Sequence, residues 1–135
     1  MSSLRPVLFL MVGVFVVPAH ADDCTKAVTQ SEMNICAAEG YKKADAELNV
    51  VYGQIVERLK NEPSRAQLLT KAQKAWVAFR DAECEFSGSG AAGGSIQPMI
   101  VAGCSEELTQ KRTAELAVYM KCQEGDMSCP VPASK

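Results

Sequence analysis

Histidine is nearly absent from this sequence, and its single copy, His20, lies in an N-terminal segment that we expect to be removed. Residues 1–21 place one arginine before a short apolar run and end in Ala19-His20-Ala21, a pattern typical of a cleaved export signal peptide. The chain that remains then has no imidazole. This excludes a histidine general base, a Ser-His or Cys-His nucleophile and histidine-ligated zinc.

Long apolar runs are also missing. The run from Val7 to Val17 is shorter than the ~20 residues that a membrane-spanning helix needs, so we predict an export signal and no membrane span. Asp22-Asp23 occupy the positions before Cys24 where lipid attachment would require small or apolar residues. We therefore expect a soluble protein without a lipid anchor. It would be located in the periplasm or secreted.

The sequence has no excess of positive charge. It contains 14 Lys and Arg against 16 Asp and Glu, a formal net charge of -2, and loss of Arg5 with the signal makes it -3. A general nucleic-acid binder would show a basic stripe, so nucleic acid is excluded as a partner. Mild acidity instead suits a basic protein partner.

No Cys-x-x-Cys pair occurs among the six cysteines, which argues against redox chemistry or zinc binding. All six lie after the signal, and the remaining chain of about 114 residues is small enough that its core alone is marginal. An even number of cysteines in an exported chain predicts three structural disulfides. We predict no metal site and no cofactor.

Helical periodicity dominates the exported part and predicts an all-α fold. A capping box at Thr29 and Glu32 opens a first helix of about eight turns, in which Ala37 to Gly40 is the place where a break is expected. Asn61 to Ser64 ends it, and Ser64 with Gln67 matches a second capping box.

The second helix, Ala66 to Phe86, has the strongest pattern, with Leu69, Ala72, Trp76 and Phe79 predicted to face the core. A flexible glycine-rich loop follows at residues 87–97, and a third helix is expected from about Pro98 to Lys121. Short connections predict a small disulfide-stapled three-helix bundle that runs up, down, up. Residues 22–121 would form this helical domain, and residues 122–135 an irregular tail that contains a disulfide.

This topology limits the disulfide pairing. It places Cys24, Cys36, Cys84 and Cys104 at one end of the bundle and Cys122 and Cys129 at the other, so Cys122 can reach only Cys129 within the ~7 Å limit between alpha carbons. Three pairings remain open for the other four. We favour Cys24 with Cys36 and Cys84 with Cys104, because the latter closes the glycine loop.

The glycine loop contains the letters G-x-G-x-x-G from Gly88 to Gly93, but a dinucleotide site needs a strand before them and a helix is expected here. We therefore predict no nucleotide. Asp81, Glu83 and Glu85 point to different sides of a helix and cannot flank one glycosidic bond. The sequence thus predicts that this protein is not an enzyme.

Polar residues next to the apolar stripes are interpreted as structural. Arg80 and Arg112 lie beside inward positions of the second and third helices, and Asp45 on the first is the best-placed carboxylate for either. Because a buried arginine requires such a pair, an interhelical bridge is favoured over a reactive site. Trp76, the sole tryptophan, is interpreted as core.

Taken together, several motifs resemble those of the LprI-type lysozyme-inhibitor family: Cys24, Glu32 to Cys36, Ala44-Asp45 with Leu48-Asn49 and Tyr52, the run Ala72 to Asp81 with Cys84, Gly93 to Ser95, Cys104, and Thr109 with Arg112 and Glu115-Leu116. The resemblance spans roughly Cys24 to Tyr119. It implies an exported, disulfide-stapled helical domain that inhibits lysozyme. The lipid-attachment cysteine of lipoprotein members is absent, and the tail with Cys122 and Cys129 is additional.

Two functions remain open. The first is a protein that binds and inhibits a lysozyme-type muramidase, with the glycine loop as a wedge whose Ser89, Ser95 and Gln97 would hydrogen-bond the catalytic carboxylates of the target. The alternative is a structural or stress-related envelope protein that binds another partner through a helix face. Deleting the loop separates them, since only the first function requires it.

Overall fold

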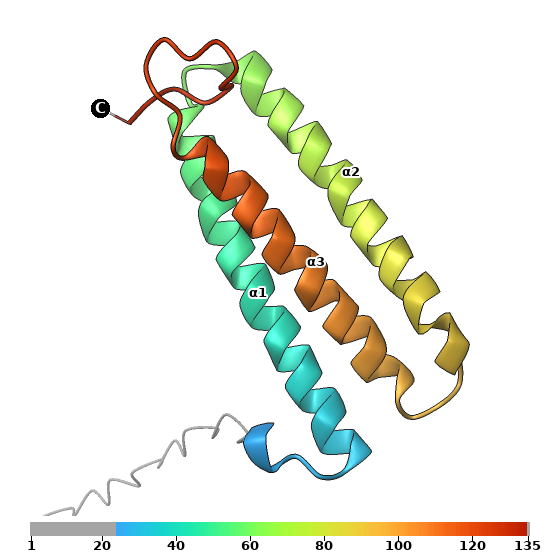
Figure 1. Ribbon diagram of the computed structural model, residues 1–135. Coiled ribbons are helices and arrows are strands. Elements are labelled where there is room, and N and C mark those ends of the chain that lie inside the picture. The colour runs from blue at the N-terminus through green and yellow to red at the C-terminus, as the bar shows by residue number, and fades with distance from the viewer. Residues whose placement is uncertain (1–23, 135) are drawn as a thin grey trace, which may run out of the picture.

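The computed structural model describes residues 24–134, which form a bundle of three long helices (Figure 1). The elements are α1 (Gln30–Arg58), α2 (Pro63–Gly88) and α3 (Gln97–Tyr119), with short 3-10 turns η1 (Cys24–Lys26) and η2 (Ser89–Ala91). No strand occurs in this part of the chain, so the predicted all-α, up-down-up bundle is confirmed. The predicted signal peptide, residues 1–21, lies outside the described residues.

The helices pack unequally. α3 lies along α1 over most of its length and also contacts α2, whereas the backbones of α1 and α2 make few close contacts (Figure 1). α1 and α2 are instead linked by side chains. None of the helices in residues 24–134 is both long and apolar enough to cross a membrane.

The start of α1 is fixed by the predicted capping box. The backbone N–H of Glu32 donates to Thr29 Oγ1 at 3.2 Å, and the Thr29 N–H donates to the Glu32 carboxylate at 2.9 Å. The N–H of Val28 donates to the same carboxylate at 3.0 Å. These hydrogen bonds stabilise the ionised carboxylate and lower the pKa of Glu32.

The expected break near Ala37 to Gly40 does not occur, because α1 is continuous from residue 30 to residue 58. Gly40 instead provides space for the Glu106 side chain of α3. A Cβ placed at Gly40 would lie 2.5 Å from a carboxylate oxygen of Glu106 on α3. The glycine therefore accommodates the Glu106 carboxylate and does not mark a kink.

The second predicted capping box is wrong. Pro63 occupies the first turn of α2, Glu62 is the N-cap residue, and no side chain caps the backbone. Because proline has no N–H and its φ already suits a helix, the helix starts before Ser64 and leaves this serine inside the first turn. α2 thus begins three residues earlier than expected and ends at Gly88.

The main core lies toward the end of the bundle where α1 meets α2. It is formed by residues from the three helices, the α1–α2 turn and the tail, namely Leu48, Ile55, Leu59, Leu116, Cys122 and Val131, with Leu69, Trp76 and Tyr119 packed around them. Val131 is only 4 % exposed although it lies in the irregular tail. The tail therefore folds back and closes this end of the core.

The inward face of α2 differs from the predicted stripe. Phe79 is 55 % exposed and Ala72 is exposed, whereas the buried positions are Arg80, Cys84 and Gly88. The helix is thus rotated so that an arginine replaces the phenylalanine in the interior. Partners for its guanidinium on all three helices make this rotation favourable, as described below.

Candidate functional site

The loop between α2 and α3 is anchored on both sides by one disulfide. Cys84 pairs with Cys104, with alpha carbons 5.5 Å apart, and Cys84 is fully buried. Four residues later Gly88 packs directly on α3, because a Cβ at this position would lie 2.5 Å from Val101 Cγ2. The two ends of the loop are therefore held close together.

The loop is shorter than the predicted segment of residues 87–97, because helices occupy both of its ends. α2 extends through Gly88, η2 adds one turn, and α3 begins at Gln97. Gly93 has a φ of +76°, which favours glycine, and its N–H donates to Gln97 Oε1 at 3.1 Å. The segment thus forms a compact turn with internal hydrogen bonds.

α1 holds the far side of this turn. Asn34 donates from Nδ2 to the carbonyl oxygen of Ser95 at 2.9 Å, and Gln30 Nε2 donates to Asn34 Oδ1 at 2.9 Å. Both residues belong to the first turns of α1, where the disulfide between Cys24 and Cys36 lies. Two disulfides and a hydrogen-bonded amide pair therefore stabilise one end of the bundle, which we call the loop end.

The three predicted binding residues have different surroundings. Ser89 donates its hydroxyl to the carbonyl of Phe86 at 2.6 Å, and Gln97 is half-buried with its oxygen bound to Gly93. Ser95 is exposed, and no hydrogen bond of its hydroxyl occurs among residues 24–134. Ser89 and Gln97 thus shape the loop, while the Ser95 hydroxyl is free to bind a partner.

Charge is distributed unevenly along the bundle. The loop-end halves of the three helices and the adjacent turns contain more carboxylates than cations: Glu32, Glu39, Asp81, Glu83, Glu85, Glu106 and Glu107 against Lys26, Lys42, Lys43 and Arg80. Arg80 is buried and contributes little to the surface. The opposite half has slightly more cations than carboxylates. The loop end is therefore the acidic end of the molecule.

Above the loop end, Arg80 links the three helices. Its Nη1 lies 3.3 Å from Asp45 Oδ1 on α1 and 3.5 Å from Thr109 Oγ1 on α3, and its Nη2 lies 2.8 Å from Asp81 Oδ1. The guanidinium is also 5.2 Å from the ring of Tyr41 and 5.2 Å from that of Trp76. Arg80 is 5 % exposed, so this set, which we call the Arg80 cluster, is a buried interhelical bridge.

Burial also changes the pKa of Tyr41, the tyrosine of the Arg80 cluster. Desolvation raises the pKa of Tyr41, and the positive charge of Arg80 partly opposes that rise. Every nitrogen of the guanidinium has a partner: Nε also donates to Asp81 Oδ1, at 2.9 Å. Burial and partners on all three nitrogens leave the guanidinium poorly accessible to a substrate, and this supports a structural role.

Arg112 extends the same stack. Its guanidinium lies 5.9 Å from the Trp76 ring, its Nε donates to Gln73 Oε1 at 3.1 Å, and its Nη1 lies 3.0 Å from Glu115 Oε2. Trp76 is thus contacted by two guanidinium groups, from α2 and α3. Asp45 pairs with Arg80 and not with Arg112, which resolves the alternative left open by the sequence.

Three residues were missed as members of these groups. Asn34 and Gln73 are ordinary polar residues in helical patterns, and Thr109 is fully buried although it is polar. No spacing rule distinguishes an amide that will meet a loop carbonyl from one that faces water. Their roles depend on contacts between distant segments, such as Asn34 with Ser95.

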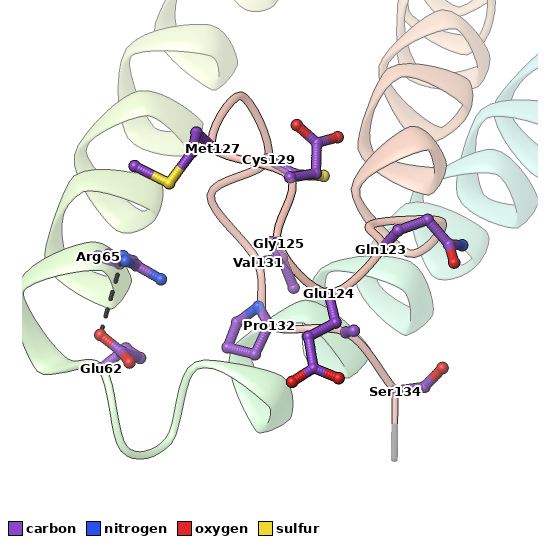
Figure 2. A pocket seen from close by; sticks show the side chains of 12 residues that line it. Glu62, Arg65, Gln123, Glu124, Gly125, Met127, Cys129, Val131, Pro132 and Ser134 are labelled. Atoms are coloured by element: carbon purple, nitrogen blue, oxygen red, sulfur yellow. Dashed lines mark ion pairs between the residues drawn. The ribbon is translucent and has the colours of Figure 1, made fainter.

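A separate pocket of about 500 Å³ lies at the other end, between the α1–α2 turn and the tail (Figure 2). Glu62 and Arg65 lie on one side, Gln123 and Glu124 on the other, and the tail passes between them (Figure 2). Its charged residues do not converge on one point. Across residues 24–134, no cluster of three or more histidine, cysteine or acidic residues suits a metal ion.

Comparison with known proteins places the chain in a family. A family model described as "Lysozyme inhibitor LprI" matches residues 21–116, which is most of the chain. The chain belongs to the LprI family. The resemblance predicted from the motifs is therefore confirmed, and the match covers α1, α2, the loop and nearly all of α3.

Two bacterial proteins of uncharacterized function are similar to this chain. The uncharacterized protein R02472 of Rhizobium meliloti is 41% identical over 139 residues, covering 92% of this chain and 99% of that protein. The uncharacterized protein YecT of Escherichia coli is 36% identical over 59 residues, covering 37% of this chain and 36% of that protein. No solved structure matches the chain significantly. R02472 thus matches this chain over nearly the full length of both proteins.

Proposed function

We propose that this LprI protein is an exported protein that binds a lysozyme-type muramidase and inhibits it by placing its loop end against the catalytic cleft. Family membership supports inhibition as the activity, and the construction of the loop end supports this surface as the site. The single observation that carries the proposal is how the turn at residues 89–96 is anchored. It is closed by the disulfide between Cys84 and Cys104 and tied to α1 by Asn34.

Rigidity matters because a flexible wedge loses conformational entropy when it binds, and this loss weakens affinity. A turn already held by a disulfide and by hydrogen bonds avoids most of this cost. The exposed Ser95 hydroxyl would donate to a carboxylate of the target, and Ser89 and Gln97 would keep the loop in shape from within. The roles of the three residues thus differ in our proposal.

The distribution of charge also supports binding through the loop end. Lysozymes are typically basic, and an acidic loop end would steer association and raise its rate. This effect decreases with salt because exposed charges are screened beyond about 8 Å at physiological ionic strength. We propose that the protein acts in the periplasm or after secretion, where its disulfides persist.

The test is a cell-wall lysis assay with oxidised protein, produced with its own N-terminal segment and purified after export. Lysozymes of several classes are each titrated with the protein at low and at high salt. We expect inhibition of at least one class to reach completion at one molecule per binding site, with an association rate that falls as salt increases. Unchanged lysis for every class would contradict the proposal and favour the alternative, an envelope protein with another partner.

A further inference from the structure

The outer face of α2 carries an apolar stripe that is exposed along its whole length. At one end of the stripe, Leu68 and Ala72 also border a groove formed with α3 and the tail. Six positions alternate at steps of four and three, all of them exposed: Leu68, Ala72, Ala75, Phe79, Ala82 and Phe86. Leu68 is 67 %, Phe79 55 % and Phe86 75 % exposed. We call this set the α2 seam. It is separated from the buried face of the same helix, where Arg80 and Cys84 lie.

This spacing has a specific geometric meaning. Alternating steps of four and three keep six side chains on one line along a helix that supercoils around a partner helix. From Leu68 to Phe86 the line extends on the order of 27 Å. Single exposed apolar residues are common, but a continuous line of this length with two phenylalanines marks an interaction surface.

The seam is complementary to itself when two copies run antiparallel. Centring the pair on residue 77 places Phe79 against Ala75 of the second copy, Ala72 against Ala82, and Leu68 against Phe86. In the central layers each large ring therefore meets a small side chain. Such pairing of large and small residues lets two helices approach closely without leaving a void.

Charges beside the seam favour the same register. Lys71 precedes Ala72, and Glu85 precedes Phe86, so both lie on the same side of the seam. In the antiparallel register these two residues lie along the same edge of the interface, and Lys71 of one copy is offset from Glu85 of the second copy by only about 3 Å along the helix axis. Twofold symmetry repeats this pair at the other end. In a parallel pair these residues would not meet, because Lys71 would lie beside Trp76 of the second copy.

We infer that this protein forms an antiparallel homodimer through the α2 seam, with Lys71 and Glu85 as reciprocal ion pairs. The inference is independent of the proposed inhibition. In such a dimer the two loop ends lie at opposite ends of the paired helices, so each remains accessible. Because three of the six seam residues are alanine, we expect a dissociation constant in the micromolar range.

The test measures molar mass by sedimentation over a range of protein concentrations, with the oxidised protein. We expect a dimer that dissociates on dilution. Phe79→Asp should raise the dissociation constant at least tenfold, because it places a charge in the centre of the seam. Val118→Asp is the matched control, since Val118 is also an exposed apolar residue, 60 % exposed, on α3. It should leave the dissociation constant unchanged.

Charge exchange tests the register. Lys71→Glu and Glu85→Lys alone should each weaken the dimer severalfold, and the double variant should restore it, because the pair is re-formed with reversed signs. Circular dichroism checks that each variant remains helical. A chain that stays monomeric at roughly 1 mM, a dimer unaffected by Phe79→Asp, or single-charge variants that the double variant does not rescue would each overturn the inference.

Discussion

The guanidinium of Arg80 on α2 lies 3.3 Å from the carboxylate of Asp45 on α1 and joins two helices whose backbones make few close contacts. The two partners are not equivalent. The Arg80 side chain is 6 % exposed and that of Asp45 is 41 % exposed, so only the arginine is removed from water. The cost of losing each partner should therefore differ.

Arg80→Ala should lower the free energy of unfolding by about 3 kcal/mol, because it removes a buried side chain that bridges three helices. Asp45→Ala should cost about 1 kcal/mol, since Asp81 remains 2.8 Å from the guanidinium and compensates its charge. Urea denaturation of both variants measures the difference. Equal costs for the two variants would show that the bridge does not depend on burial of the arginine.

Gly88→Ala should destabilise the protein by about 1 to 3 kcal/mol, because the new methyl group would collide with Val101 on α3. Adding Val101→Ala should recover part of this loss. Gly53→Ala is the matched control: Gly53 lies within α1 with no atom within 4 Å of a Cβ, so its replacement should stabilise by up to about 1 kcal/mol. Thermal melts distinguish the three variants, and destabilisation by both glycine substitutions would contradict the packing argument.

Removal of the disulfide between Cys84 and Cys104 by paired alanine substitution should reduce stability by about 3 kcal/mol in the chain-entropy model. Removal of the pair Cys122 and Cys129, whose sequence separation is 7 rather than 20, should cost about 2 kcal/mol. Hydrogen exchange should show faster exchange at residues 89–96 only in the first variant. Equal acceleration in both variants would argue against local anchoring of the loop.

Acid should weaken the start of α1 through Glu32. Its pKa is lowered below the ordinary value of 4.5 in the folded state, so the folded chain binds fewer protons than the unfolded chain at this site. The stabilisation is complete above pH 4.5 and is lost as pH falls through the folded-state pKa. Glu32→Gln removes this titration. The difference in melting temperature between wild type and Glu32→Gln should therefore shrink from pH 7 to pH 3, and a constant difference would contradict the assignment.

Local rules predicted the elements of the fold well, because their causes are local. The capping box at Thr29 and the three helices depend on residues within a few positions of each other, and they occur as expected. The capping box at Ser64 failed because Glu62 is the N-cap residue and the helix starts at Pro63, before Ser64. The sequence pattern alone does not decide between a helix capped by Ser64 and a helix that begins at Pro63.

The interior of α2 was harder to predict for a different reason. The prediction assumed that apolar residues are buried, and it therefore placed Phe79 in the interior and not Arg80. Arg80 is nevertheless buried, because Asp45, Asp81 and Thr109 provide partners that the sequence does not place near it. The same limit applies to the loop, whose order depends on Asn34, a residue far away in the chain.

The central claim is that the loop end inhibits a muramidase, and the most direct test compares two matched variants in the lysis assay. Ser95→Arg adds bulk and positive charge at the exposed loop residue, whereas Ser64→Arg makes the same change at an exposed residue on the opposite end of the bundle. We predict that Ser95→Arg raises the inhibition constant at least tenfold and that Ser64→Arg leaves it unchanged. Full inhibition by Ser95→Arg, or equal loss in both variants, would contradict the account.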